Sequence, residues 1–241
     1  MKDNLQDLIA HIHGLAAIDV IKIVGTDTST NFSAVSQDKN GRIVIEGQLL
    51  TPDPNFIGTF GMPNLDKLKT ILGFDEYDEN AKIHTSYESN IPKVIHFENK
   101  VGDFVNDYRL MSAGIVNEKV GNVSFKGALW NIEFEPTIEG INRLKKQAQA
   151  NSDQENFKIK IENDNLKIYF GDPATHSGNF VFYPNISGTL SRTLEFPVNL
   201  VIQVLNMAGD KKIAIADKGI LEITINSGIG LYRYLILAQS K

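Results

Sequence analysis

The sequence predicts an α+β protein built from two similar domains. An amphipathic helical pattern around residues 2–18 leads into strand-like runs, and a second short helical pattern opens at Pro63. The same order starts again at residues 137–150, and its second helix opens at Pro197. The offset from first to second helix is roughly sixty residues in both halves, which indicates an internal duplication. Helices placed regularly among short strands are typical of an α+β architecture.

The 241 residues suffice for two domains that each bury a core. Residues 112–127 show neither helical nor strand periodicity, apart from a few scattered apolar side chains. We therefore expect an N-terminal domain over residues 1–111, an interdomain linker over 112–127 and a C-terminal domain over 128–241.

In the first half, the opening helix has an apolar stripe formed by Leu5, Leu8, Ile12 and Leu15. Its polar face is expected to carry Asn4, Asp7 and His11. Strands are expected at residues 20–24, 32–35, 42–49, 55–60, 82–87, 94–98 and 104–110. Asn40-Gly41 suits a tight hairpin turn before the third of these strands. The second helix has the apolar positions Leu65, Leu68, Ile71 and Leu72, and Gly73 is its expected end.

In the second half, strands are expected at residues 129–134, 157–161, 166–170, 180–183, 189–196, 212–216, 219–225 and 231–237. The helix that follows Thr137 is expected to turn Ile138, Ile141, Leu144 and Ala148 toward the core. The fourth helix spans residues 197–208 and ends at Gly209. Its residues Leu200 and Val204 make it apolar on several sides.

Composition excludes several functional classes. No apolar run reaches the roughly 18–20 residues of a membrane span, and the N-terminus does not resemble a signal peptide, so we expect an intracellular, non-membrane protein. The absence of cysteine removes disulfides, thiolate nucleophiles and sulfur ligands. A net charge of −5 argues against a uniformly basic nucleic-acid binder, although the distribution of charge matters more than its sum.

Catalytic and metal-binding patterns are also missing. His11 and His13 are two apart and point to different sides of a helix. His84, His96 and His176 have no carboxylates at ligand spacing. The acidic run at residues 75–79 lacks the alternating ligands and glycine of a calcium loop, and a solvated loop is the favoured interpretation. We expect no enzyme activity, cofactor or metal, although acids such as Asp75, Glu76 and Asp78 leave a metal-dependent enzyme as an alternative.

Basic residues gather on the helices and just beyond them. The second helix carries Lys67 and Lys69, and the third carries Arg143, Lys145 and Lys146. Lys211 and Lys212 follow the fourth helix. On a single helix, exposed Lys and Arg residues usually serve only to keep the protein soluble. Because the second and third helices occupy corresponding or adjacent places in a duplicated unit, however, we expect a basic surface for the sequence-independent binding of duplex phosphates.

With this pattern in place, the chain resembles a DNA sliding clamp, most closely the polymerase processivity factor of T4-like bacteriophages. Proliferating cell nuclear antigen shares that fold. The resemblance rests on two stretches in which a strand runs into a helix, residues 55–74 (NFIGTFGMPNLDKLKTILGF) and 189–209 (TLSRTLEFPVNLVIQVLNMAG). It also rests on residues 107–111 and on the terminal run at 231–237.

The resemblance implies a homotrimeric ring around double-stranded DNA, with helices lining a channel and antiparallel sheets outside. It implies a DNA polymerase and a clamp loader as partners, roles in viral DNA replication and late transcription, and residence in the cytoplasm of an infected bacterium. In such clamps a partner peptide docks between the linker and the C-terminal strand. In this chain that groove would use Ile115, Val116, Tyr234, Ile236 and Leu237.

Ring closure is expected to pair an edge strand of the first domain with one of the second domain in the next subunit. The candidate edges are residues 104–110 and 166–170. The alternative function is a phage virion or tail-assembly protein, in which duplicated β-rich domains also form symmetric assemblies.

Overall fold

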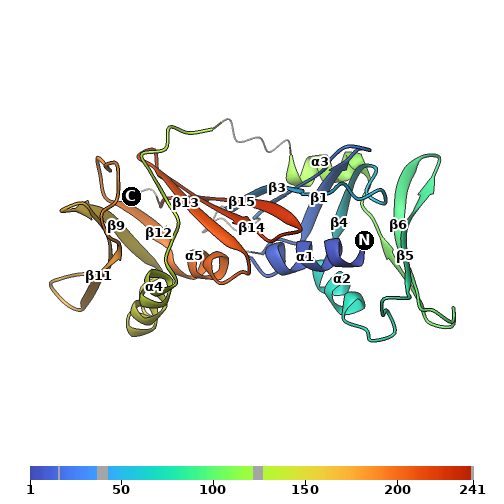
Figure 1. Ribbon diagram of the computed structural model, residues 1–241, viewed down its shortest axis with the longest axis horizontal. Coiled ribbons are helices and arrows are strands. Elements are labelled where there is room, and N and C mark those ends of the chain that lie inside the picture. Colours follow the sequence, from blue (N-terminus) through green and yellow to red (C-terminus); the bar gives the residue numbers. More distant parts are fainter. Residues whose placement is uncertain (16, 37–42, 122–126, 240–241) are drawn as a thin grey trace. The chain divides into compact units, whose positions relative to one another are not determined.

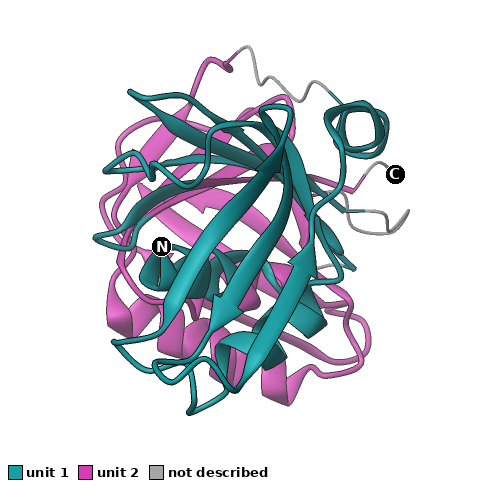
Figure 2. Cartoon of the chain, turned by 90° about the vertical axis from the view of Figure 1, so that its right-hand side faces the viewer, with its two compact units in different colours: residues 1–37, 44–124, 226–232 teal, residues 38–43, 125–225, 233–241 magenta. Residues whose placement is uncertain are grey.

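The computed structural model describes residues 1–15, 17–36, 43–121 and 127–239 (Figure 1). The chain forms two compact units (Figure 2). Unit 1 contains Met1–Gln37, Val44–Ser124 and Asn226–Tyr232, and unit 2 contains Asp38–Ile43, Phe125–Ile225 and Arg233–Lys241. The expected Asn40-Gly41 turn lies outside the described residues.

Unit 1 contains two antiparallel sheets. The first has the order β4-β1-β2-β3, formed by β1 (Val20–Gly25), β2 (Thr30–Val35), β3 (Ile43–Leu49) and β4 (Gly58–Pro63). The second has the order β5-β6-β7, formed by β5 (Lys82–Glu88), β6 (Ile91–Glu98) and β7 (Val105–Arg109). Beyond β7, Met111 bridges to Gly61 of β4.

Helices α1 (Lys2–Ile12) and α2 (Leu65–Leu72) pack together beside the first sheet of unit 1 (Figure 1). The expected stripe of α1 is confirmed, since Leu5, Leu8, Ile12 and Leu15 are buried. The helix ends at Ile12, earlier than the pattern predicted, and Leu15 lies beyond it. Under the second sheet, the buried Tyr77 ring lies close to the rings of Phe74, Phe97 and Phe104.

The expected polar face of α1 is wrong at two positions. Asp7 and His11 are buried, because the last part of the chain meets the helix there. Tyr232 donates its hydroxyl to Asp7 at 2.6 Å, Ser227 donates its own at 2.9 Å, and the His11 ring stacks on Tyr232 with centroids 4.4 Å apart. These partners satisfy a carboxylate that burial would otherwise penalise.

A third helix of unit 1, α3 (Ala113–Val120), lies where no regular element was expected. It packs on β1 and β4 through the buried Val116 and Val120. Gly61 makes this contact possible, since a Cβ at that position would lie 2.8 Å from Val116 Cγ2. The helix therefore depends on tertiary packing more than on its own periodicity.

Unit 2 repeats the order of elements. Its four-stranded sheet has the order β11-β10-β9-β12, formed by β9 (Asn156–Glu162), β10 (Asn165–Gly171), β11 (Ser177–Tyr183) and β12 (Leu194–Pro197). Strands β8 (Ile132–Phe134), β13 (Asp210–Ala216) and β14 (Ile220–Asn226) form a further antiparallel group. Helices α4 (Ile138–Ala150) and α5 (Val198–Leu205) pack against each other.

The last strand, β15 (Gly230–Leu237), passes from unit 1 into unit 2 at residue 233. Within the described residues, α1 and α4 are each followed by four strands, a second helix and three strands. The duplication predicted from the sequence is thus present as an order of elements, and the fold class is confirmed as a two-domain α+β fold with antiparallel sheets.

Three expected element boundaries are corrected. β4 begins at Gly58 and not at residue 55, because Asp53 accepts a hydrogen bond from the Asn55 backbone and holds a turn there. β8 begins at Ile132, and Leu129 is exposed before it. β12 begins at Leu194, after a loop that covers residues 189–193.

Candidate nucleic-acid interface and partner surface

Helix α2 presents the first pair of candidate cations. Leu65, Leu68 and Leu72 anchor the helix in the core of unit 1, and Asn64 caps its start by accepting a hydrogen bond from the Lys67 backbone. This anchoring leaves Lys67 and Lys69 exposed on the other side. Neither lysine is within ion-pair distance of an acidic group among the described residues.

Helix α4 presents the second group. Its Thr137 cap accepts from the Gly140 backbone, and Gly140 lies so close to β11 that a Cβ would meet the Phe182 oxygen at 2.6 Å. Arg143 and Lys146 are exposed, and Lys145 is half-buried. Arg143 pairs with Glu139 one turn earlier at 2.5 Å, which leaves the two lysines as the unpaired cations of this helix.

The way α4 packs on β11 shows that part of its predicted core face is wrong. Only Leu144 of the four predicted inward residues is fully buried, and Ile138 is 80% exposed. Ile138 is two positions before Gly140, and residues two apart on a helix do not share a face. The contact of Gly140 with β11 therefore turns Ile138 toward solvent.

Lys211 and Lys212, at the start of β13, are less available. Burial, followed by repulsion from Lys145, lowers the pKa of Lys211, while Asp210 opposes the shift. Lys212 pairs with Glu133 at 2.5 Å, and that contact raises its pKa. Neither residue behaves as a freely exposed lysine.

The other helix of each pair offers amides in place of cations. The exposed positions of α5 are Asn199 and Gln203, and Asn206 is exposed directly after the helix. Helix α1 exposes Gln6 together with the acidic Asp3. Leu200 and Val204 of α5 are buried, so its apolar sides belong to the core of unit 2. Among these four helices, cationic character is therefore concentrated on α2 and α4.

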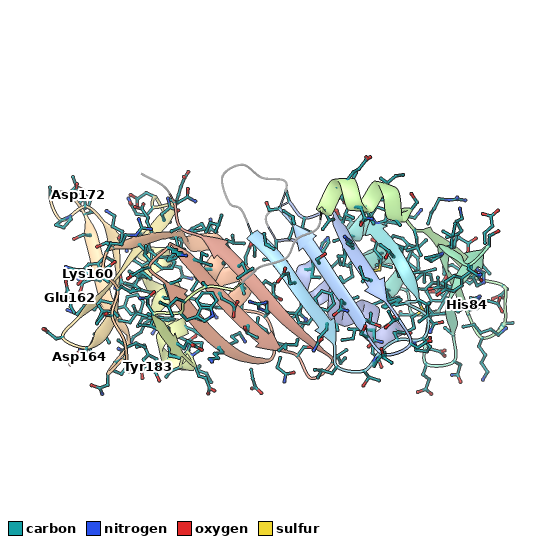
Figure 3. All side chains as sticks on the ribbon, turned by 90° about the horizontal axis from the view of Figure 1, so that it is seen from above. His84, Lys160, Glu162, Asp164, Asp172 and Tyr183 are labelled. Carbon is teal, nitrogen blue, oxygen red and sulfur yellow. The ribbon has the colours of Figure 1, made fainter. Side chains whose placement is uncertain are left out.

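Many cations of the sheets, by contrast, are neutralised locally. Glu162 accepts hydrogen bonds from Lys160, Lys167 and Tyr169, at 2.7, 3.1 and 2.6 Å. The bond from Lys160, followed by those from Tyr169 and Lys167, lowers the pKa of Glu162 to about 2. Figure 3 shows Lys160 and Glu162 close together, with Asp164 and Asp172 at opposite ends of β10. In unit 1, Lys82 pairs with Glu98 in the same manner.

Each unit also contains edge strands, which pair with only one neighbouring strand. β7 is an edge of the three-stranded sheet in unit 1, as expected for residues 104–110. The expectation for residues 166–170 is wrong, because β10 pairs with both β9 and β11. The edge strands of this sheet are β11 and β12. The Gly/Ser-rich composition of residues 171–179 concealed the strand β11.

The five residues expected to form a partner groove differ in exposure. Val116, Tyr234 and Ile236 are fully buried, so a partner cannot contact their side chains. Ile115 is 50% exposed and Leu237 is 46% exposed. Next to α3 in unit 1, an open cavity of about 190 Å³ is lined by Asp19, Val20, Val35, Lys119 and Val120. Sequence reasoning missed these residues because α3 itself was not expected.

Among the described residues, no cluster of three or more His, Asp or Glu side chains is arranged to hold a metal ion. His96 contacts Asp107 at 2.8 Å and Glu98 at 3.5 Å, and its ring lies 5.2 Å from that of His84. Asp75, Glu76, Asp78 and Glu79 are exposed around the buried Tyr77. In the part of the chain that the structure describes, no helix has the length and apolar character needed to cross a bilayer.

The architecture is that of the PCNA sliding clamps. One similar structure is A. fulgidus PCNA in its complex with the C-terminal region of FEN-1. The TM-score is 0.66, with 10% identity over 100% of this chain and 96% of that chain. PCNA from Thermococcus kodakaraensis gives a TM-score of 0.65 and 12% identity over 99% and 97%. No protein-family model and no curated protein matches the sequence. At this identity the likeness shows the fold.

Proposed function

We propose that the protein is a ring-forming sliding clamp that encircles duplex DNA and tethers a DNA polymerase for processive synthesis. The observation that carries this proposal is the repetition, in both units of a clamp fold, of one cationic helix beside one amide-bearing helix. Lys67 and Lys69 of α2, and Lys145 and Lys146 of α4, lack acidic partners among the described residues, and Arg143 adds a cation paired only within its helix.

Such a surface suits a clamp for a physical reason. A ring retains DNA by topology, so it needs mobile phosphate contacts and no base readout. Exposed lysines on helices provide these contacts. Ion-paired cations on the sheets, such as Lys160 and Lys82, are less able to hold DNA on the wrong surface.

We propose that the ring closes head to tail, with β7 of one subunit beside β11 of the next. Two similar units per chain favour closure after three copies, because such a trimer has six similar units around its axis. Pairing these strands would also remove two exposed edges. A clamp loader would open the ring.

The finer identity rests on sequence resemblance. We propose a clamp of a T4-like bacteriophage that acts in the cytoplasm of an infected bacterium and supports late transcription as well as replication. The order of elements and the strand-to-helix stretches at residues 55–74 and 189–209 support this proposal.

Retention on DNA of different topology tests the function. After loading onto nicked circular plasmid, the protein should stay with the DNA through gel filtration in moderate salt. Cutting the plasmid once should release it within the time of the column. Equal retention on circular and linear DNA would show simple electrostatic binding. No retention on either would favour the alternative of a virion or tail-assembly protein.

A further inference from the structure

The three-stranded sheet of unit 1 brings two histidines together on one of its faces. His84 of β5 and His96 of β6 are register partners on antiparallel strands, and such partners project to the same side of a sheet. Their imidazole ring centroids lie 5.2 Å apart. His84, which is labelled in Figure 3, is exposed, and the His96 side chain is 23% exposed. Both rings are therefore accessible from solvent.

Asp107 fixes the orientation of the His96 ring. It lies opposite His96 on β7, and its carboxylate contacts His96 Nδ1 at 2.8 Å. Because a carboxylate only accepts hydrogen bonds, Nδ1 carries a proton here. In a neutral imidazole the lone pair then belongs to Nε2. Histidine ligands of metal ions are oriented in the same way, by a carboxylate that holds one ring nitrogen and leaves the other available.

A second carboxylate lies beside the available nitrogen. Glu98 Oε2 is 3.5 Å from His96 Nε2, which is longer than an ordinary hydrogen bond. The other Glu98 oxygen contacts Lys82 at 2.7 Å. A lone pair on Nε2 repels a carboxylate oxygen at this distance unless a positive charge lies close to both. A cation bound to Nε2 would supply that charge, and Glu98 could accept a hydrogen bond from water on the cation.

The spacing of the two rings suits a shared transition-metal ion. Zn–N bonds are about 2.0–2.1 Å long, so two imidazoles on one tetrahedral ion have ring centroids about 5 Å apart. The separation of 5.2 Å between His84 and His96 agrees with this value. Imidazole is a ligand for zinc, copper and nickel, whereas Mg²⁺ and Ca²⁺ prefer oxygen. Water would fill the remaining positions, so the ion should exchange readily.

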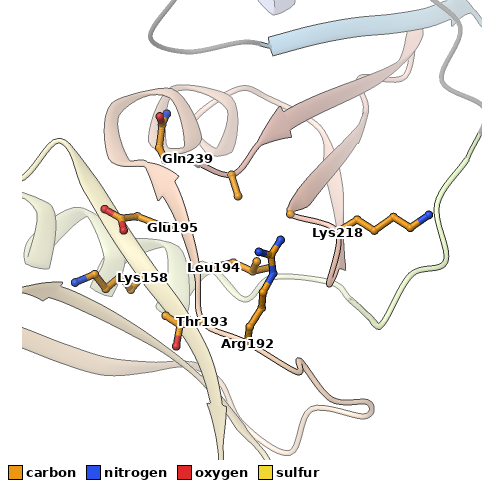
Figure 4. Close-up of a pocket in the computed structure, with 9 residues that line it drawn as sticks. Lys158, Arg192, Thr193, Leu194, Glu195, Lys218 and Gln239 are labelled. Atoms are coloured by element: carbon orange, nitrogen blue, oxygen red, sulfur yellow. The ribbon is translucent and has the colours of Figure 1, made fainter. Parts of the chain in front are cut away.

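The open cavity of unit 2 provides a contrast. It has a volume of about 420 Å³, and Lys158, Arg192 and Lys218 are among its lining residues (Figure 4). Ammonium and guanidinium groups have no lone pair to give to a metal ion. Glu195 supplies the one carboxylate among the described lining residues, and none of those residues is a histidine. A cavity alone therefore does not indicate a metal site in this protein.

We propose that His84 and His96 together bind one divalent transition-metal ion of the zinc class, with Asp107 as a positioning residue for His96. The ion would join β5 to β6, and the contact with Asp107 extends its site to β7. The proposal is separate from the proposed function, because these residues all belong to unit 1 and binding requires neither DNA nor a second subunit. The sequence did not predict this site, since only strand pairing brings His84 and Asp107 to His96.

The test is calorimetric titration of the full chain with Zn²⁺ at slightly alkaline pH, since metal binding requires neutral histidine. We expect one zinc ion per chain, with a Kd in the micromolar range, and no binding of Mg²⁺. His84→Gln and His96→Gln should each weaken zinc binding at least about tenfold, because each removes one of the two nitrogen ligands. In nuclear magnetic resonance spectra, the imidazole protons of both histidines should shift together when zinc is added.

The role of Asp107 is tested by two substitutions. Asp107→Ala should weaken zinc binding about tenfold, since groups that orient a ligating histidine contribute about 10–100-fold to metal affinity. Asp107→Asn should restore part of the loss, because its amide oxygen still accepts a hydrogen bond from His96 Nδ1. Both variants should keep the circular dichroism spectrum of the unchanged protein. Equal affinities in the Ala and Asn variants would show that Asp107 does not act by orienting the ring.

His13→Gln is the matched control for the two histidine variants. His13 also contacts a carboxylate, that of Asp66 at 2.7 Å, but it is not paired with a second imidazole among the described residues. This substitution should leave the zinc affinity unchanged. Zinc should also raise the thermal unfolding midpoint of His13→Gln but not that of His84→Gln, because a ligand stabilises only a folded state that binds it.

Three outcomes would overturn the proposal. The absence of saturable binding at submillimolar zinc would leave His96 as an imidazolium that bridges Asp107 and Glu98. Equal losses in His84→Gln and His13→Gln would mean scattered binding to surface histidines. Binding of Mg²⁺ as tight as that of Zn²⁺ would mean attraction by the carboxylates alone. None of these results bears on retention on circular DNA, so the proposed function stands or fails by its own test.

Discussion

At the scale of single residues, burial separates the side chains that stabilise the fold from those available for binding. Asp7 and His11 occupy positions of α1 that a helical pattern assigns to solvent, yet both are buried against Tyr232. Their partners lie more than 200 residues later in the sequence, and no local pattern reports such a contact. The exposed lysines of α2 and α4, in contrast, were predictable, because they lie opposite strong apolar stripes.

The Asp7 network predicts a dependence of stability on pH. Burial alone would raise the pKa of Asp7, but hydrogen bonds from His11, Tyr232 and Ser227 lower it below its ordinary value. A carboxyl with a lowered pKa stabilises the fold fully above its unfolded value of about 3.9, and the contribution is lost as the pH falls through the folded value. Asp7→Asn should therefore lower stability at pH 7 by about 1.5–3 kcal/mol and by less near pH 3.

Urea unfolding followed by circular dichroism at both pH values measures this difference. Asp3→Asn, an exposed change on the same helix, is the control and should shift neither midpoint appreciably. A loss in Asp7→Asn that is equal at pH 7 and pH 3 would show that the carboxylate charge is unimportant.

The cations of α4 yield a second prediction at this scale. Replacing Arg143 and Lys146 with Glu should reverse the charge of the exposed helix face and weaken retention on circular DNA. The solution mass should stay unchanged. Lys100→Glu combined with Lys119→Glu makes the same charge change on exposed positions of unit 1. If both double variants lose retention on circular DNA equally, the net charge of the protein governs the effect and α4 is not a specific DNA-binding surface.

At the scale of elements, the edge strands β7 and β11 and the helix α3 are the features that bear most on assembly. The edge at β7 was expected from the sequence. The edge at β11 was not, because β10 has the stronger strand pattern and a regular apolar alternation, while β11 begins in a polar Ser-Gly-Asn run. Helix α3 could not be predicted for a related reason. Val116 and Val120 are its only buried residues, and Gly114 lowers the helix propensity of the segment.

Edge pairing through β7 can be tested with one substitution. Val105 is 48% exposed on this strand, so a lysine fits there in the isolated chain. At a subunit interface the same lysine would be desolvated without a designed partner, which is costly. Val105→Lys should therefore reduce the mass measured by light scattering from that of a trimer to that of a monomer. Val101→Lys, in the adjacent loop and 79% exposed, should remain trimeric.

The partner surface gives a fourth prediction. Ile115 and Leu237 are the two expected groove residues with exposed side chains. Changing both to Ser should abolish processive synthesis on primed circular templates before it disturbs the oligomer. A single apolar anchor of this kind contributes on the order of 1–3 kcal/mol to binding. Leu129→Ser removes an apolar side chain that is 83% exposed and serves as the control. Undiminished processivity in the double variant would place the groove elsewhere.

At the scale of the whole molecule, the sequence predicted the order of elements well. The duplicated pattern placed α1, α2, α4 and α5, because each has apolar residues at helical spacing. The last three also have a proline or a capping residue at the start. The pairing of strands could not be predicted, since it depends on contacts between distant parts of the chain. The same holds for the candidate site. The exposed cations could be predicted from the local sequence pattern, whereas ion pairs such as that of Lys212 with Glu133 could not.

The oligomeric state provides a prediction at the scale of the whole molecule. Light scattering at micromolar concentration should give about three times the 26.8 kDa of one chain, as closure of two-unit subunits into a six-unit ring requires. A face-to-face dimer or a stable monomer at that concentration would contradict the head-to-tail arrangement.

The division of β15 between the units has a consequence for biosynthesis. Residues 226–232 complete unit 1, where Ile229 accepts a hydrogen bond from Leu50 and Tyr232 covers Asp7. A ribosome releases these residues only after it has translated all of residues 125–225. The half that emerges first must therefore wait, with Asp7 and its neighbours uncovered, until the last strand arrives. A nascent chain halted after residue 124 should stay sensitive to protease, whereas a chain extended past residue 232 outside the exit tunnel should become protected.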